Sequence, residues 1–310
     1  MKLGYFTACF TDSSLEALCE HAHSAGFDAL EVAAWPGTTR DRTACHLDVT
    51  RLPERDADRV RGLFAAHDLT LSAISYYENN LHPDTRRRAE IHAHLRACVE
   101  AAARLGVRHV GTFVGRDPGL TVAANLALAE RVLPPLVDFA AGHGVALVVE
   151  NCPMEGWHPD GYPGNLAYSP ELWEWMFGLG LHLNYDPSHL LWLGIDPVGA
   201  LEWLAAGGFA DRVGHVQAKD TRVLPAGRDR HGVFGRAIRG ADPWRSGWWE
   251  YRMPGLGDVD WRGVVDALYR IGFDGVIAIE HEDPHWSGDD ARVRHGLEYA
   301  RRTLRPLLVA

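Results

Sequence analysis

The sequence lacks the features that direct a chain to a membrane or to nucleic acid. None of its apolar runs approaches the roughly 18 residues that cross a bilayer. Met1–Thr7 enters an apolar stretch without a charged leader or a cleavage site. The formal net charge is −10, and the longest basic run is Arg86-Arg87-Arg88. We therefore expect a cytoplasmic protein with no membrane partner and no nucleic-acid partner.

Cysteines are few, and their spacing does not pair them. The sequence holds five, an odd number, at Cys9, Cys19, Cys45, Cys98 and Cys152. This scatter is typical of a reduced protein. Cys152 follows Glu150 closely and is a candidate nucleophile, although no motif places a base beside it.

Strand-like and helix-like segments alternate along the whole chain, which predicts an α/β fold with a parallel sheet. We expect strands at about 3–9, 28–33, 69–75, 107–114, 145–151, 181–186, 212–218 and 275–281. The expected helices include 14–25, 84–105, 120–142, 170–179 and 197–206. Eight strands in 310 residues, 46% of them hydrophobic, fit a (β/α)8 TIM barrel that forms a single domain over residues 1–310.

The connections between these segments differ on the two faces of the expected barrel. Helices run into the next strand through a single glycine at Gly26, Gly106, Gly144, Gly180 and Gly272. The connections from strand to helix are long, above all 221–260, which we interpret as an insertion covering the barrel mouth. Active sites of such barrels lie on the face where these long loops gather.

Four apolar strands in succession end in polar side chains that suit a metal ion. The residues at these ends are Glu150, Asp186, Gln217 and Glu280. Because the carboxyl ends of neighbouring parallel strands meet at one edge, we expect these side chains to lie together. Carboxylate and amide oxygens are ligands for Mn²⁺ or Mg²⁺ and leave positions open for a substrate.

These motifs jointly resemble those of the xylose-isomerase-like barrel superfamily of sugar phosphate isomerases and epimerases, over roughly residues 3–305. The family pattern is a Glu ending strand five, Asp-x-x-His at strand six, His-x-His or His-x-Gln in strand seven and a Glu ending strand eight. This chain has Glu150, Asp186-Pro187-Ser188-His189, Gly214-His215-Val216-Gln217 and Glu280. Strand seven is similar to the Gly-His-Ile-Gln of hydroxypyruvate isomerases, in which the glutamine is the ligand.

The resemblance implies a set of roles for these residues. One divalent metal ion, Mn²⁺ with Mg²⁺, Co²⁺ or Zn²⁺ as alternatives, would be held by Glu150, Asp186, Gln217 and Glu280. The two glutamates would also be the acid/base pair, while His189 and Lys219 would contact a substrate oxygen. Lys219 and Asp220 are alternatively a structural ion pair at the barrel rim.

The implied activity is isomerisation or epimerisation of a keto or aldo sugar, or a related polyol, by proton abstraction next to a carbonyl. A first alternative is a lyase or deglycosidase that eliminates the aglycone of a 3-oxo-glycoside. A second is a catalytically silent sugar-binding protein. Endonuclease action at abasic DNA, known in one branch of the superfamily, is disfavoured by the acidic charge.

The loops supply candidate contacts for a small-molecule carbohydrate. These are His215, Trp35, Trp157, Arg222 and Arg252. His215 is alternatively a core histidine, and Trp248 and Trp249 either stack on a ligand or pack the insertion onto the barrel. The resemblance also implies a homo-oligomer.

Overall fold

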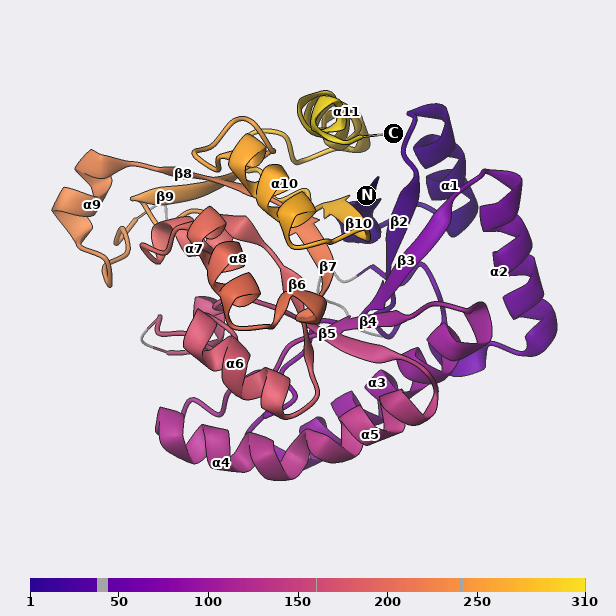
Figure 1. The fold of residues 1–310 in the computed structure, drawn as a ribbon, viewed down its shortest axis with the longest axis horizontal. Helices are drawn as coiled ribbons and strands as arrows, with labels where there is room; N and C mark the ends of the chain where they lie inside the picture. The colour runs from indigo at the N-terminus through magenta and orange to yellow at the C-terminus, as the bar shows by residue number, and fades with distance from the viewer. Residues whose placement is uncertain (38–43, 160, 240–241, 243, 310) are drawn as a thin grey trace.

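Eight parallel strands close into a barrel in the computed structural model, which describes residues 1–37, 44–159, 161–239, 242 and 244–309. The strands follow one another in the order β1-β10-β7-β6-β5-β4-β3-β2, and β2 pairs with β1 to close the ring. Helices surround the ring (Figure 1). This confirms the expected (β/α)8 TIM barrel.

The bounds of the elements follow the expected alternation. The barrel strands are β1 (Lys2–Phe6), β2 (Ala29–Ala33), β3 (Thr70–Ser75), β4 (His109–Thr112), β5 (Ala146–Glu150), β6 (His182–Tyr185), β7 (Val213–Ala218) and β10 (Val276–Ile279). The helices are α1 (Leu15–Ser24), α2 (Glu54–Ala66), α3 (Thr85–Leu105), α4 (Val122–Val132), α5 (Pro134–Gly142), α6 (Pro170–Gly178), α7 (Pro187–Trp192), α8 (Pro197–Ala206), α9 (Pro225–His231), α10 (Trp261–Arg270) and α11 (Asp290–Leu304).

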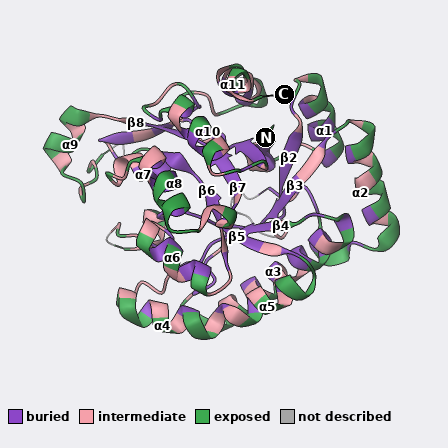
Figure 2. Cartoon of the chain, viewed as in Figure 1, coloured by how far each residue is buried: buried purple, intermediate pink, exposed green. Residues whose placement is uncertain are grey.

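The core lies inside the barrel and between the barrel and its helices. All four residues of β10 are buried, as expected for a parallel strand that is covered on both faces. Figure 2 shows buried residues along the strands and exposed residues on the outward sides of the helices. The glycines expected to end helices have positive φ, for example 71° at Gly106, which caps α3.

Two element boundaries differ from the expectation. The single helix expected over 120–142 is two helices, because Pro134 lacks the N–H that would continue α4 and instead opens α5. The strand expected over 3–9 ends at Phe6 and continues as a 3-10 helix over Thr7–Cys9.

The described part of the 221–260 stretch forms an antiparallel hairpin beside the barrel. Its strands β8 (Asp220–Val223) and β9 (Trp249–Arg252) pair with each other, and α9 lies between them in the sequence (Figure 1). Trp249 stacks on Trp192 of α7 at 4.9 Å between ring centroids, and Trp248 and Trp249 are each only 2% exposed. The structure therefore favours packing of the insertion over stacking on a ligand for these two tryptophans.

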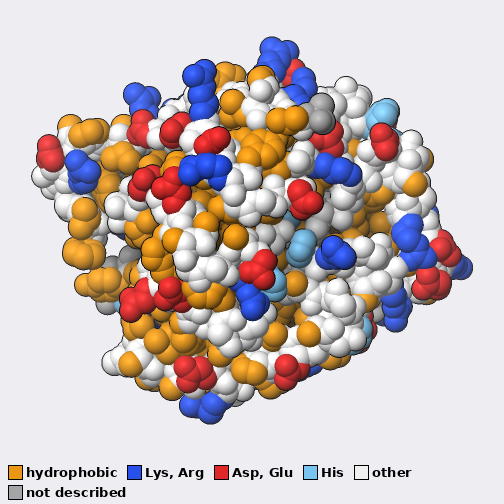
Figure 3. Space-filling view, viewed as in Figure 1, with side chains coloured by type: hydrophobic (Ala, Val, Ile, Leu, Met, Phe, Trp, Pro, Cys, Tyr) orange, Lys and Arg blue, Asp and Glu red, His pale blue; other side chains and the backbone are white. Residues whose placement is uncertain are grey.

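Three large apolar side chains are exposed at the outer end of this insertion. Val233, Phe234 and Ile238 are exposed there. Hydrophobic side chains gather at the left edge of Figure 3, where the insertion lies, while positive and negative side chains are intermingled over the rest of that face. No helix in the described part of the chain is long and apolar enough to cross a membrane.

Asp220 fixes the start of the hairpin to the segment that leads from β9 into α10. Its carboxylate accepts hydrogen bonds from the backbone N–H groups of Gly255 and Val259 and from Trp261 Nε1, at 2.9 to 3.0 Å. Asp220 is fully buried, and burial raises the pKa of its carboxyl group. Its partners are these donors, so the alternative of an ion pair between Lys219 and Asp220 is wrong.

We predict that Asp220→Ala lowers the free energy of unfolding by about 3 kcal/mol or more, because each buried donor left without an acceptor costs about 1–3 kcal/mol. Urea denaturation followed by tryptophan fluorescence measures the loss. Asp84→Ala is the matched control, since it removes only the exposed N-cap of α3 and is expected to cost about 1 kcal/mol. Equal losses in the two variants would contradict the anchoring role.

Candidate metal and acid–base site

Three carboxylates from neighbouring strand ends converge at the barrel mouth. Glu150 ends β5, Asp186 follows β6 and Glu280 follows β10. One oxygen of each lies within 4.8 Å of the others, and all three side chains are buried. The strand order β5-β6-β7-β10 brings these ends together, as the sequence analysis expects for parallel neighbours. We call these three side chains the carboxylate cage.

Local hydrogen bonds position each member of the cage. Asn151 and Asp186 bind each other twice, because the Asn151 side chain donates to Asp186 O at 2.8 Å and accepts from Asp186 N at 2.7 Å. Asp186 Oδ1 caps α7 by accepting from Ser188 N, which leaves Oδ2 for the cage. Glu280 N donates to Ala218 O of β7, so Glu280 is held next to Lys219.

The ammonium group of Lys219 lies among four carboxylates. Its Nζ is 2.6 Å from Glu280 Oε2, 3.0 Å from Glu282 Oε2, 3.2 Å from Asp186 Oδ2 and 3.9 Å from Glu150 Oε1. Burial alone would lower the pKa of Lys219, but the surrounding carboxylates raise it well above its usual value. Lys219 is therefore a charged group at the centre of the site.

Negative charge exceeds positive charge in this cluster. Four carboxylates face one ammonium and the imidazole of His189, so the acidic groups outnumber the basic groups by two. Burial alone would raise the pKa of Asp186, but Lys219 and His189 lower it to about 2. The pKa of Glu280 is raised well above its usual value, by burial and by its acidic neighbours against the effect of Lys219.

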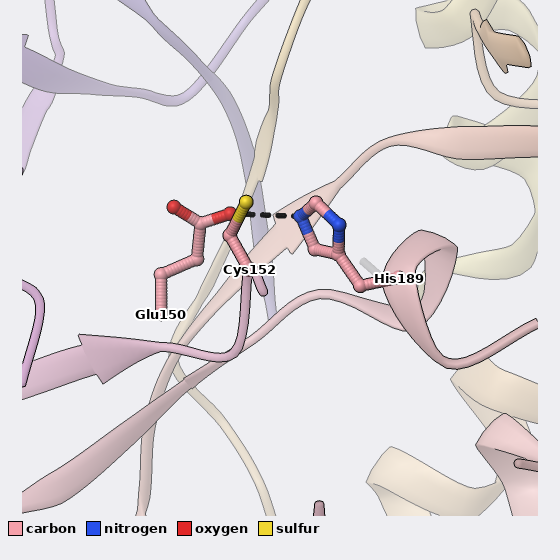
Figure 4. Close-up of side chains that lie close together, drawn as sticks. All are labelled: Glu150, Cys152 and His189. Atoms are coloured by element: carbon pink, nitrogen blue, oxygen red, sulfur yellow. Dashed lines mark hydrogen bonds and ion pairs between the residues drawn. The ribbon is translucent and has the colours of Figure 1, made fainter. Parts of the chain in front are cut away.

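His189 connects the cage to the insertion. Its Nε2 is 3.0 Å from Glu150 Oε1 and 3.2 Å from Asp186 Oδ2, while its Nδ1 is 2.8 Å from Tyr251 Oη of β9. Figure 4 shows the His189 ring beside Glu150 and Cys152. Burial raises the pKa of the Cys152 thiol to about 12, which argues against the candidate nucleophile.

Gln217 lies in β7, two residues before Lys219, and is held through one end of its amide. Its Nε2 donates to both oxygens of Glu31, at 3.2 and 3.3 Å, and to Tyr77 Oη at 3.2 Å. Its Oε1 is buried and has no hydrogen-bond partner among the described residues. A buried acceptor without a donor suits a cation ligand.

Glu31 is the residue of this site that the sequence analysis misses. It lies in β2, is fully buried and accepts further hydrogen bonds from Ser75 Oγ and Tyr77 Oη, each at 2.7 Å. Burial raises its pKa to about 7. A single acidic residue in the otherwise apolar Ala29–Ala33 was the available signal.

His215 lies inside the barrel, away from the cage. Its Nδ1 is 3.1 Å from Asn184 Oδ1 and its Nε2 is 3.1 Å from Ser72 Oγ, and the side chain is buried. Burial lowers its pKa to about 3. Both ring nitrogens already have partners, which favours the core-histidine alternative over a substrate contact.

Aromatic rings line the opposite half of the mouth. Phe6, Trp35, Tyr77, Phe113 and Trp157 follow the ends of β1 to β5, with neighbouring centroids 5.0 to 6.2 Å apart. Trp35 is 9% exposed, and Trp157 is partly exposed. The structure thus places both candidate tryptophans beside the mouth.

The two candidate arginines differ in their contacts and in their exposure to solvent. Arg252 Nε donates to Asp283 Oδ2 at 2.9 Å and its Nη1 to Glu250 Oε1 at 3.3 Å, so its guanidinium is already paired. Arg222 is exposed on β8. Neither lies among the residues that contact the cage.

The donor set fits a hard divalent cation. The cage offers three carboxylates, Gln217 offers an unpartnered amide oxygen, and the uncompensated charge is negative. Oxygen ligands of this kind hold Mn²⁺ or Mg²⁺ and also admit Zn²⁺.

Comparison with known proteins gives consistent matches. Residues 19–303 match the family described as xylose isomerase-like TIM barrel. The uncharacterized protein YfiH of Bacillus subtilis (strain 168) is 26% identical over 325 residues, which cover 98% of this chain and 99% of that protein. Inosose dehydratase of Geobacillus kaustophilus (strain HTA426) is 31% identical over 134 residues, 42% of this chain and 39% of the enzyme.

Solved structures share the fold at low sequence identity. The IolI protein with a bound zinc atom superposes with a TM-score of 0.69 at 19% identity, covering 99% of this chain and 96% of the other. D-psicose 3-epimerase of Clostridium cellulolyticum H10 gives 0.68 at 15% identity and full coverage of both chains, 100% each. The 3-keto-D-glucoside 4-epimerase YcjR of E. coli gives 0.67 at 16%, covering 97% and 99%.

We predict that Glu31→Gln raises the dissociation constant for Mn²⁺ about 10- to 100-fold, the usual effect of losing a group that orients a metal ligand. A carboxylate at position 31 can only accept from Gln217 Nε2, whereas a glutamine there can either donate or accept. The substitution therefore no longer forces Gln217 Oε1 to point away from position 31. Isothermal titration of the metal-free protein measures the change. Ser75→Ala, which removes one of the other donors to Glu31, is the control and is expected to change it less. Unchanged binding in a folded Glu31→Gln protein would contradict the assignment.

Proposed function

The chain belongs to the xylose isomerase-like TIM barrel family, and from that premise we propose that it is a divalent-metal-dependent sugar isomerase or epimerase. Its substrate would be a keto or aldo sugar, or a related polyol, and the reaction begins with proton removal next to a carbonyl. The observation that carries the proposal is the convergence of Glu150, Asp186 and Glu280 on one buried point at the barrel mouth.

The proposed cofactor is one divalent ion, Mn²⁺ first and Mg²⁺, Co²⁺ or Zn²⁺ as alternatives, held by Glu150, Asp186, Gln217 and Glu280. The all-oxygen donor set supports Mn²⁺, and the zinc atom bound by the IolI protein, which shares this fold, supports a divalent ion. When bound, the ion polarises a substrate carbonyl and stabilises the negative charge that develops on its oxygen.

Glu150 and Glu280 are proposed as the acid/base pair. They approach the cage from β5 and β10, on either side of β6 and β7, so they face a bound substrate from different directions. One carboxylate takes the proton next to the carbonyl and the other returns a proton. Return to the neighbouring carbon isomerises the sugar, and return to the opposite face of the same carbon epimerises it.

His189 is proposed to hold Glu150 in place and to reach a substrate oxygen. Its bond to Glu150 fixes the orientation of that carboxylate, and its own ring is fixed by Tyr251 from the insertion. Lys219 is proposed as a donor to the developing oxyanion.

The charges at the mouth support an uncharged, unphosphorylated substrate. The cluster around Lys219 is already rich in carboxylates, and Arg252 is paired with Asp283 and Glu250. A phosphate group here would meet negative charge without a free guanidinium among these residues. The aromatic row from Phe6 to Trp157 offers apolar faces to the C–H side of a sugar.

We predict that the protein with Mn²⁺ exchanges a carbon-bound hydrogen of a keto sugar with solvent deuterium. D-fructose, D-psicose and D-tagatose in D₂O, followed by proton NMR, form the first panel. Glu150→Gln is expected to abolish exchange because the amide cannot accept the proton. Glu202→Gln, an exposed change on α8, is expected to exchange at the wild-type rate.

Exchange that persists in Glu150→Gln would remove Glu150 from the proton transfer. Mn²⁺ that binds with no exchange or turnover on a broad sugar panel would favour the catalytically silent sugar-binding protein.

A second candidate reaction is elimination. The same proton removal from a 3-oxo-glycoside expels the group on the β-carbon. The partial match to inosose dehydratase and the shared fold with 3-keto-D-glucoside 4-epimerase favour testing it. Under this alternative the Mn²⁺ protein releases the aglycone from a nitrophenyl 3-oxo-glucoside, seen by absorbance, and Glu150→Gln does not. An intact glycosidic bond after complete deuterium exchange would exclude elimination.

A further inference from the structure

Lysine is rare in this protein, and one of its two lysines lies inside the cage. Lys2 and Lys219 are the only lysines in the sequence, and the remaining basic side chains of the Lys+Arg total of 31 are arginines. Lys2 is at the surface, where its Nζ donates to Thr70 Oγ1. Lys219 is 1% exposed, which is rare for a lysine unless it is paired.

The Lys219 ammonium lies within 3.9 Å of an oxygen of each of the three carboxylates proposed as metal ligands. Three of its four carboxylate partners, Glu150, Asp186 and Glu280, are the cage itself. A divalent ion bound to these oxygens at about 2.0–2.2 Å lies within the same small volume. Two cations a few ångströms apart in a buried site repel strongly, so the ammonium and the ion exclude each other from this position.

We propose that Lys219 is the resident counter-ion of the metal-free cage and that its ammonium leaves the centre of the cage when a divalent ion binds. The proposal rests on the metal site of the proposed function. The ammonium partly compensates the carboxylates in the metal-free protein and so keeps them together without the ion. The same contacts weaken metal binding, because the ion has to replace them.

The structure contains a second position for the ammonium. Glu282 Oε2 is 3.0 Å from Nζ, and its side chain is 31% exposed, whereas the three cage carboxylates are at most 11% exposed. The ring of Tyr251 lies 4.7 Å from Nζ and provides a cation–π contact. Movement toward Glu282 keeps an ion pair and brings the ammonium to the open side of the site, where a substrate oxygen would lie.

The scarcity of lysine permits a direct test by NMR. Protein labelled with carbon-13 at lysine Cε gives one signal from Lys2 and one from Lys219, and Lys2→Met assigns them. We expect titration with Mg²⁺, a diamagnetic ion, to shift the Lys219 signal along the same binding curve as calorimetry and to leave the Lys2 signal unchanged.

A variant provides the second measurement. Lys219→Met keeps most of the side-chain length and removes the charge, so we expect it to bind Mn²⁺ at least about tenfold more tightly and to melt at a lower temperature than the wild type without metal. Lys2→Met is the matched control and is expected to change neither quantity. If Lys219→Met fails to fold, the NMR titration of the wild type still tests whether the ammonium moves.

The possible outcomes separate this inference from the proposed function. The inference is overturned if metal binds and the Lys219 signal does not shift. It is also overturned if a folded Lys219→Met binds Mn²⁺ no more tightly than the wild type. Both results leave the proposed metal-dependent function standing. A wild-type protein that binds neither Mg²⁺ nor Mn²⁺ overturns the metal-dependent function, and the inference falls with it.

Discussion

Buried negative charge that requires a compensating cation is the constraint on which the active face depends. Glu150, Asp186 and Glu280 are held together by the barrel, and Glu282 adds a fourth carboxylate next to Lys219. Ionised carboxylates in a buried cluster are stable only when cations or donors face them. Lys219 and His189 supply part of this positive charge, and the divalent ion of the proposed function would add to it. The stability of the buried cluster and the proposed chemistry thus both require positive charge at this place.

The barrel and its insertion contribute different residues to the site around this charge. The strands β5, β6, β7 and β10 position the proposed metal ligands, and β2 adds Glu31, which holds the Gln217 amide. The hairpin of β8 and β9 is fixed by Asp220 and by the stack of Trp192 and Trp249, and it delivers Tyr251 to His189. The insertion is therefore part of the site's support.

The fold and the convergence of the three carboxylates were accessible from the sequence because they follow from local rules. Alternating periodicity predicts the strands, and the common edge of parallel strands predicts that Glu150, Asp186 and Glu280 meet. Glu31 was missed because a lone acid in an apolar strand has no partner in sequence. Tyr251 could not be predicted, since its contact with His189 depends on how the hairpin packs against α7. The Lys219 position likewise depends on four carboxylates brought together only by the closed barrel.

The most direct test of the central claim, that a divalent cation neutralises the carboxylate cage, is an anomalous difference map from crystals of this protein soaked in Mn²⁺. We expect one strong peak bounded by Glu150, Asp186, Glu280 and the Gln217 amide oxygen, with Lys219 Nζ outside that group. A peak elsewhere, or none at saturating Mn²⁺ with Lys219 still between the carboxylates, would contradict it.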